Sequence, residues 1–248
     1  HGNEDAALEI LSALELTQEH VQSLLECAAR EAPAAIDKVR TMAAAQNIAL
    51  NVACFEPMIK VFAKWSDPRA FALLDEMQTQ GLSCSTSVCC SVVAMCVESK
   101  NVPLAEYVLS QARMAGTANL PLYSTVLKVY AATRQFEKTC DIYAQLTDDG
   151  LEPDTVMYGG LIKAAVECGQ LELSRKLLRQ SGTMDIQNYM SLFRACGRER
   201  NVRKALDLLK ELEESDVGID TTAYNCVLDV CLKSGDMRQG TELFAKMK

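Results

Sequence analysis

Residues 120–154 read LPLYSTVLKVYAATRQFEKTCDIYAQLTDDGLEPD, and this stretch decides the fold. Tyr123 and Val126 are spaced as neighbours on one face of a first helix, and a second apolar run with Ile142 and Leu146 follows. Neither run alternates with the period of two that a half-buried strand shows. The stretch is therefore predicted to form a hairpin of two helices.

The same pattern recurs about every 35 residues. Counted from the first residue of each predicted first helix, the units are 52–85, 86–119, 120–154, 155–185, 186–220 and 221 to the end, with a weaker copy at 18–51. About seven units result, the last one incomplete. Residues 1–17 are interpreted as the end of an upstream repeat or a helical cap.

Two columns of residues support this register. The fourth residue of each unit is large or thiol-bearing, as expected for the helix seam: Phe55, Cys89, Tyr123, Tyr158, Tyr189 and Tyr224. A column of small residues marks where two helix backbones approach closely: Ala70, Ala105, Thr139, Ser174, Ala205 and Gly240. One hairpin cannot bury its apolar face alone, so neighbours must stack. The predicted fold is all-α, a right-handed α-solenoid (superhelix) of tandem hairpins, continuous over residues 18–248.

Composition excludes several classes of function. The 248 residues include 33 acidic and 25 basic side chains, a net charge of -8, so no long-range attraction draws the chain to nucleic-acid phosphates. DNA is not an expected partner. No apolar run approaches the ~20 residues that a membrane helix needs, so membrane insertion is not expected.

The cysteines and histidines provide little material for catalysis. Cys96, Cys196 and Cys231, three of eleven cysteines, share one column of the predicted seam and are expected to be buried thiols. Only two histidines are present, and the cysteines do not form the paired Cys-x-x-Cys motifs of a zinc site. We therefore expect no catalytic residues, no metal and no cofactor within this segment, and predict that it is not an enzyme; a catalytic domain outside the segment stays open.

The tandem hairpins resemble pentatricopeptide repeats over about residues 18–248. The best copies are residues 120–154 and TTAYNCVLDVCLKSGDMRQGTELFAKM from Thr221. The tetratricopeptide repeat is the nearest alternative, but its first helix carries a glycine after the Leu column. Here that position is large in every unit: Ile59, Val93, Leu127, Ile162, Phe193 and Leu228.

The resemblance implies binding of single-stranded RNA, with one base per repeat read by the fifth and last residues of each unit. By position, the pairs are Glu56/Ser85, Cys90/Asn119, Ser124/Asp154, Gly159/Asp185, Met190/Asp220, and Asn225 without a partner in the sequence. Ser124/Asp154 resembles a guanine reader, Met190/Asp220 a uracil reader and Asn225 a pyrimidine reader. The other three pairs depart from the family pattern.

The resemblance also implies phosphate contacts at the thirteenth position, which holds Lys64, Arg198 and Lys233. Glu98, Ala132 and Glu167 occupy this position in the other units. Seven basic residues against five acidic ones give the first helices a net charge of +2: Lys60, Lys64, Lys128, Lys163, Arg194, Arg198 and Lys233 against Glu56, Glu98, Glu167, Glu199 and Asp229. Three scattered phosphate contacts predict weak binding or a short footprint.

The implied role is that of an organellar RNA-binding protein, in a mitochondrion or chloroplast, which acts in RNA processing, stability or translation. The alternative is a protein-protein scaffold, held with other proteins in a large organellar assembly, in which base reading is weak or lost. The acidic net charge and the departing pairs favour this alternative. So does the second position of each unit, where only Val156 is typical of the family.

Overall fold

The computed structural model describes residues 15–182, 186–214, 219 and 221–247, and the regular elements within these ranges are all helical. The chain forms two compact units, His1–Thr133 and Arg134–Lys248. The boundary falls inside the hairpin of residues 120–154, between its two helices. Each unit is described by itself, and the single continuous domain over residues 18–248 stays a prediction.

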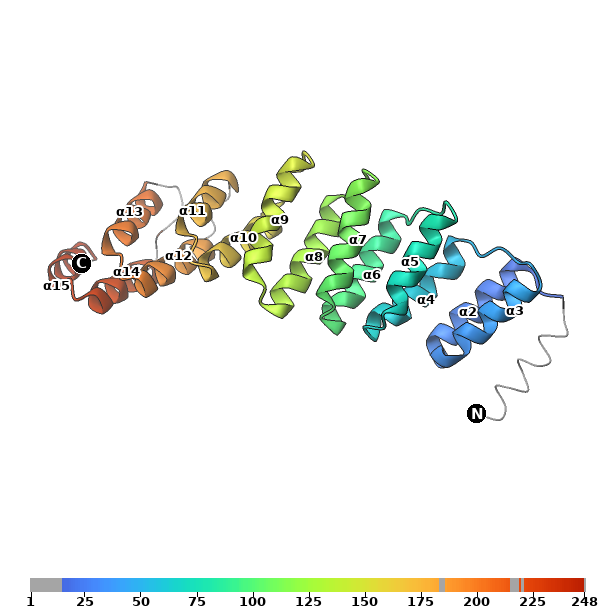
Figure 1. The fold of residues 1–248 in the computed structure, drawn as a ribbon. Coiled ribbons are helices and arrows are strands. Elements are labelled where there is room, and N and C mark those ends of the chain that lie inside the picture. The colour runs from blue at the N-terminus through green and yellow to red at the C-terminus, as the bar shows by residue number, and fades with distance from the viewer. Residues whose placement is uncertain (1–14, 183–185, 215–218, 220, 248) are drawn as a thin grey trace. The chain divides into compact units, whose positions relative to one another are not determined.

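The first unit alternates first and second helices of successive hairpins (Figure 1). In chain order these are α2 (Gln18–Glu31), the 3-10 turn η1 (Pro33–Ala35), α3 (Ile36–Ala45), α4 (Val52–Lys64), α5 (Arg69–Thr79), α6 (Thr86–Ser99), α7 (Val102–Met114) and α8 (Leu120–Thr133). The first helices pack on one another in sequence, α2 on α4, α4 on α6 and α6 on α8. Each second helix also packs on its own first helix, as α5 does on α4 and α7 on α6.

The second unit repeats this arrangement. It contains α9 (Phe136–Asp148), α10 (Thr155–Glu167), α11 (Leu171–Gln180), α12 (Ile186–Glu199), α13 (Val202–Glu213), α14 (Thr221–Ser234) and α15 (Met237–Lys246). Helix α10 packs on α12, and α12 packs on α14. Within both units the stacking of hairpins builds the predicted α-solenoid.

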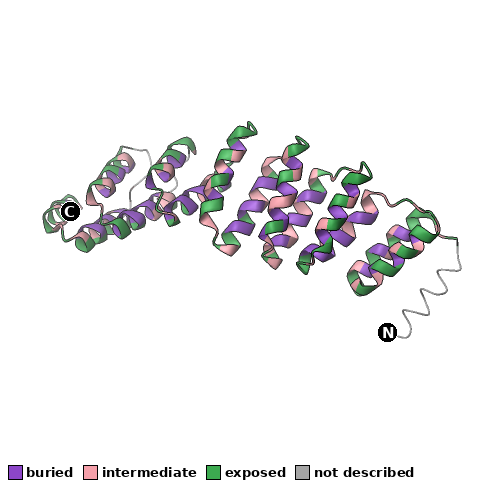
Figure 2. Ribbon diagram, in the orientation of Figure 1, coloured by how far each residue is buried: buried purple, intermediate pink, exposed green. Residues whose placement is uncertain are grey.

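Most residues of the predicted columns are buried (Figure 2). In the fourth column Phe55, Cys89, Tyr123 and Tyr189 are buried, whereas Tyr158 and Tyr224 are half-buried. In the small-residue column, Ala70, Ala105, Thr139, Ser174 and Ala205 are all buried. A Cβ atom placed on Gly240 would lie 3.5 Å from the Cβ of Cys231, so the last member also faces a neighbouring helix closely. The small column therefore lies at buried helix contacts, as the sequence predicts.

Cysteine burial is also confirmed, since Cys96, Cys196 and Cys231 are at most 1% exposed. Burial raises the pKa of Cys96 to about 12 and that of Cys196 to about 11. These thiols are therefore protonated apolar packing residues at neutral pH.

Polar side chains connect consecutive hairpins at intervals close to one repeat. On the second helices, Arg40 donates to Glu76 at 2.5 Å and Tyr143 donates to Gln180 at 2.7 Å. At the far ends of first helices, the Ser99 hydroxyl donates to the Ala63 carbonyl at 2.9 Å. These bonds fix the register of neighbouring hairpins, because each joins residues 36 or 37 positions apart.

Candidate nucleic-acid interface

The last residues of the units cap the first helices that follow them. Asn51, at the same place before α4, begins the series by accepting from the backbone N–H of Cys54 at 3.0 Å. The other acceptors are Ser85 from Val88 at 3.3 Å, Asn119 from Leu122 at 3.1 Å and Asp154 from Met157 at 2.7 Å. Asp185 and Asp220, the corresponding predicted base readers, lie outside the described residues. The described last residues are therefore N-caps of first helices.

Capping fixes these side chains at the N-terminal ends of the first helices. An N-cap oxygen satisfies one backbone N–H that the helix itself leaves without a partner. Only one oxygen of Asp154 makes the cap bond, so its second oxygen retains its acceptor capacity. In Asn119 the cap uses the carbonyl oxygen, which leaves the amide NH₂ group as a donor. The cap thus fixes the side chain while leaving hydrogen-bonding capacity for a ligand.

The fifth residues lie one turn further along each first helix. Cys90, Ser124 and Gly159 are half-buried, and Asn225 is exposed. Cα–Cβ bonds in a helix tilt toward its N-terminus, so the side chains of Cys90 and Ser124 lean toward the capped ends of their helices. Within the first unit, Cys90 lies on α6 and Asn119 caps α8, and these two helices pack on each other. Ser124 is on α8 of the first unit and Asp154 caps α10 of the second.

Two fifth residues are already engaged within the protein. The Glu56 carboxylate accepts from the Lys60 ammonium at 2.5 Å. Met190 is only 5% exposed, and the Cys226 thiol lies 3.5 Å from its thioether sulfur. Met190 therefore belongs to the packed seam in this structure, a placement that the spacing of the sequence did not indicate. The unit that begins at residue 186 presents its predicted base reader least.

Val156, the one typical second residue, lies in the first turn of α10 beside the Asp154 cap. Its side chain is 76% exposed, although a valine of this helix could have been buried against a neighbour. An exposed apolar side chain beside a polar cap can pack on the face of a base while the cap bonds the base edge. Val156 and Asp154 together make the end of α10 the most complete candidate contact among the described residues.

The three predicted phosphate contacts differ in availability. Lys64 is exposed, and its side chain makes no hydrogen bond or ion pair with the residues that the structure describes. Arg198 instead donates to Glu167 at 3.2 Å and to the Val166 carbonyl at 3.1 Å. Lys233 pairs with Asp229 at 2.6 Å. Arg198 and Lys233 would have to exchange a carboxylate for a phosphate, whereas Lys64 would not.

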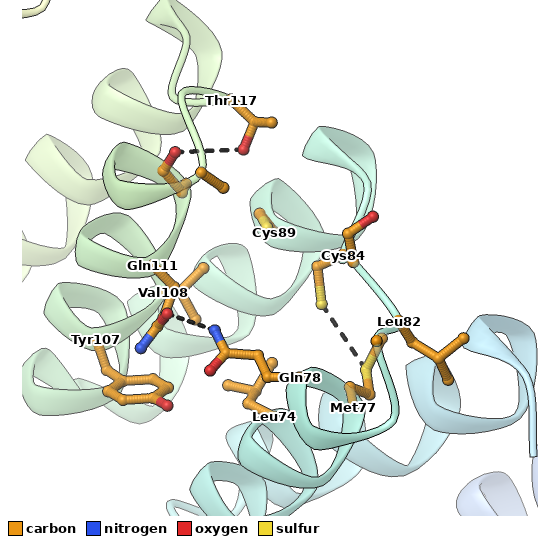
Figure 3. A pocket seen from close by; sticks show the side chains of 14 residues that line it. Leu74, Met77, Gln78, Leu82, Cys84, Cys89, Tyr107, Val108, Gln111 and Thr117 are labelled. Atoms are coloured by element: carbon orange, nitrogen blue, oxygen red, sulfur yellow. Dashed lines mark hydrogen bonds between the residues drawn. The ribbon is translucent and has the colours of Figure 1, made fainter.

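A cavity of about 320 Å³ lies on the second helices of the first unit, between α5 and α7 (Figure 3). Leu74, Met77 and Val108 give it an apolar lining. Among its lining residues, the Cys84 sulfur points toward the Met77 sulfur, 3.8 Å away (Figure 3). A hydrogen bond from Cys89 lowers the pKa of Cys84, while the same bond raises that of Cys89. None of the predicted base readers or phosphate contacts lines this cavity.

In the described part of the chain, no three His, Cys, Asp and Glu side chains are grouped so that they could hold a metal ion. None of the described helices is both long and apolar enough to cross a bilayer.

Tandem helical hairpins with small-residue seams and capped first helices define an α-helical repeat protein. A family model for the pentacotripeptide-repeat region of PRORP matches residues 12–184, and the PPR repeat model matches residues 188–217 and 222–248. The chain therefore belongs to the pentatricopeptide repeat family.

Known proteins agree with this assignment. A chloroplastic pentatricopeptide repeat-containing protein of Arabidopsis thaliana is 27% identical over 124 residues, covering 50% of this chain and 14% of the relative. The crystal structure of the pentatricopeptide repeat protein PPR10 from maize aligns with a TM-score of 0.54 and 20% identity, over 99% of this chain and 37% of PPR10. PPR10 in complex with an 18-nt psaJ RNA element aligns with a TM-score of 0.51 and 20% identity, over 95% of this chain and 34% of that chain. This chain spans well under half the length of these proteins.

Proposed function

We propose that this protein binds single-stranded RNA at the N-terminal ends of its first helices, and that it acts in organellar RNA processing, stability or translation. The observation that carries the proposal is the series of capping side chains Asn51, Ser85, Asn119 and Asp154, each bonded to a helix N-terminus. They recur at intervals of 34 or 35 residues, so each hairpin offers one fixed polar side chain. A modular ligand with one base per repeat fits this arrangement.

Relatives support the ligand and the compartment. PPR10, whose fold this chain shares, is known in complex with an RNA element. Chloroplastic proteins are among the Arabidopsis thaliana relatives. A mitochondrion or chloroplast is therefore the proposed location, and base reading is assigned to Ser124, Asp154, Asn225, Cys90, Asn119 and Gly159, with Met190, Asp185 and Asp220 as the remaining predicted positions.

A scaffold for protein partners is the second candidate function. The observation that favours it is the engagement of two predicted base readers within the protein. Met190 is 5% exposed in the packed seam, and the Glu56 carboxylate is paired with Lys60 at 2.5 Å.

Fluorescence anisotropy with a randomised single-stranded RNA pool at two salt concentrations tests the proposal. Binding should weaken as salt rises, because phosphate contacts release counterions. A variant that combines Ser124→Ala with Asp154→Asn keeps the helix cap and should change base preference. Thr125→Ala removes a neighbouring hydroxyl outside the fifth column and serves as the control. Absence of binding at low salt would reject the RNA proposal and favour the scaffold.

A further inference from the structure

In the six hairpins from residue 52 onward, the turn between the two helices contains one residue with a left-handed backbone conformation. The residues in this column are Ser66, Lys100, Arg134, Gly169, Arg200 and Gly235, with φ between 53° and 77°. Glycine adopts this conformation easily, whereas a residue with a long side chain adopts it at a cost. Lys100, Arg134 and Arg200 keep it at φ values of 54°, 56° and 53°. Three basic residues thus occupy positions where glycine would suit the backbone better.

Contacts within the protein do not explain these three side chains. Ser66, in the same column, uses its hydroxyl to donate to the Ser99 carbonyl at 3.4 Å. Lys100, Arg134 and Arg200 are exposed, and their side chains make no hydrogen bond or ion pair with any described residue. Their charges are therefore available to a ligand.

The turn residue is basic in hairpins whose thirteenth residue, two positions earlier, is not an available cation. Where that position holds the unpaired Lys64, the turn residue is Ser66. Where it holds Glu98 or Ala132, the turn residue is basic. In the hairpin that begins at residue 186, Arg198 is occupied by Glu167, and the turn again supplies an unpaired cation, Arg200. Four hairpins thereby present, at the end of the first helix, one cation each that forms no ion pair with a described residue.

Neighbouring turns lie side by side within each unit. In the first unit, the Ser99–Ala63 hydrogen bond of 2.9 Å joins the ends of α6 and α4, which carry Lys100 and Lys64. In the second unit, the Arg198–Val166 bond of 3.1 Å joins the ends of α12 and α10. Two residues of chain span at most about 7 Å, a displacement that a long basic side chain can bridge. A cation in the turn can therefore reach the position of a phosphate that a cation at the thirteenth position would contact.

We propose that Lys100, Arg134 and Arg200 contact the phosphates of a single-stranded RNA and replace the thirteenth residue in hairpins where that residue is not an available cation. This inference rests on the proposed RNA-binding function. The hairpin of residues 155–185 has Glu167 at the thirteenth position and Gly169 in the turn, so the row of phosphate contacts is interrupted there.

The test is the triple variant Lys100→Gly, Arg134→Gly and Arg200→Gly, titrated with the randomised RNA pool and with several defined RNA sequences over a series of salt concentrations. The plot of log K against log salt should become shallower by about 2, because each phosphate contact contributes about 0.7 for single strands. Binding should weaken equally for all defined sequences, because phosphate contacts carry no base information. The midpoint of thermal unfolding should be unchanged or higher, since glycine suits the left-handed turn.

A matched control removes three positive charges from second helices, by Lys176→Gln, Lys210→Gln and Lys246→Gln. Its salt slope should stay close to that of the unaltered protein. An unchanged slope in the glycine variant, or an equal loss in the control, would overturn the assignment of the turn cations while leaving RNA binding intact. Failure of the unaltered protein to bind RNA would overturn the proposed function together with this inference.

Discussion

The carboxylate of Asp154 accepts a hydrogen bond from the backbone N–H of Met157 at 2.7 Å, so one side chain both ends a repeat and starts the next helix. Replacing Asp154 with Ala should lower the free energy of unfolding by about 1 kcal/mol, the usual cost of losing an N-cap. Asp154→Asn should stay within a few tenths of a kcal/mol, because asparagine caps equally well. Chemical denaturation of the three proteins measures the difference.

Measurement of RNA binding separates the capping role of Asp154 from its proposed base-reading role. Asp154→Asn replaces an acceptor with a donor on the face that the cap leaves free, so preference for guanine should fall while stability is retained. Equal base preferences in the aspartate and asparagine proteins would restrict Asp154 to a capping role.

Glu211 connects two hairpins of the second unit by accepting from Arg175 at 2.5 Å and from Arg179 at 2.7 Å. Burial raises the pKa of Glu211, but the hydrogen bonds from Arg179 and Arg175 outweigh it and leave the pKa below its ordinary value. A carboxylate with a lowered pKa stabilises the fold above its unfolded pKa, about 4.3, and loses this contribution as pH falls through the folded pKa.

Glu211→Gln should therefore destabilise the protein by about 1–3 kcal/mol at pH 7, and the difference should shrink below about pH 4. Denaturation at pH 7, 5 and 3 checks this. The matched variant Glu214→Gln changes an exposed partner of Lys210 and should have almost no effect at any pH. A deficit in Glu211→Gln that persists unchanged at pH 3 would contradict the ionic explanation.

Cys84 and Cys90 are both half-buried, yet their thiols should react at different rates. The hydrogen bond from Cys89 lowers the pKa of Cys84, whereas burial and the neighbouring Cys89 raise that of Cys90. Because the thiolate is the nucleophile, iodoacetamide should modify Cys84 faster than Cys90 at pH 8, as followed by peptide mass spectrometry. Labelling in denaturant provides the control, since the two rates should then become similar.

Ala205 is fully buried in the small-residue column, while Ala144 is exposed on α9 of the same unit. Ala205→Leu should cost roughly 1–3 kcal/mol of stability by overpacking the helix contact. Ala144→Leu adds the same atoms in solvent and should be almost neutral. Thermal unfolding would show the contrast, and two equal midpoints would mean that the column does not set the helix spacing.

The columns of large and small residues were sufficient to predict the helical hairpins, because burial between helices imposes a period that survives in one sequence. Tyr123, Phe193 and Ala205 are buried where that period places them. The same columns did not predict which candidate site residues are exposed. Met190 occupies a predicted reading position but packs into the seam, because neighbouring hairpins decide how far a fifth residue is covered.

The ion pairs between neighbouring repeats also could not be predicted from the sequence. Arg198 and Glu167 are 31 residues apart, and only the stacking of α10 and α12 brings their charges together. The left-handed turn residues had a weak sequence signal, since Gly169 and Gly235 mark two of the turns and Lys100 stands at the corresponding place in another. That column could have been identified by aligning units on the turn glycines.

If the last residues of the repeats read bases as proposed, capping also limits how the RNA target can change. A residue that both begins a helix and faces a base must satisfy folding before it can specify a nucleotide, and Ser, Thr, Asp and Asn are the side chains that serve well. A mutation at the end of a repeat that removes the cap thus destabilises the fold, whatever its effect on base preference. At Asn119 or Asp154, new base preferences can therefore evolve only through the few residue types that cap helices well.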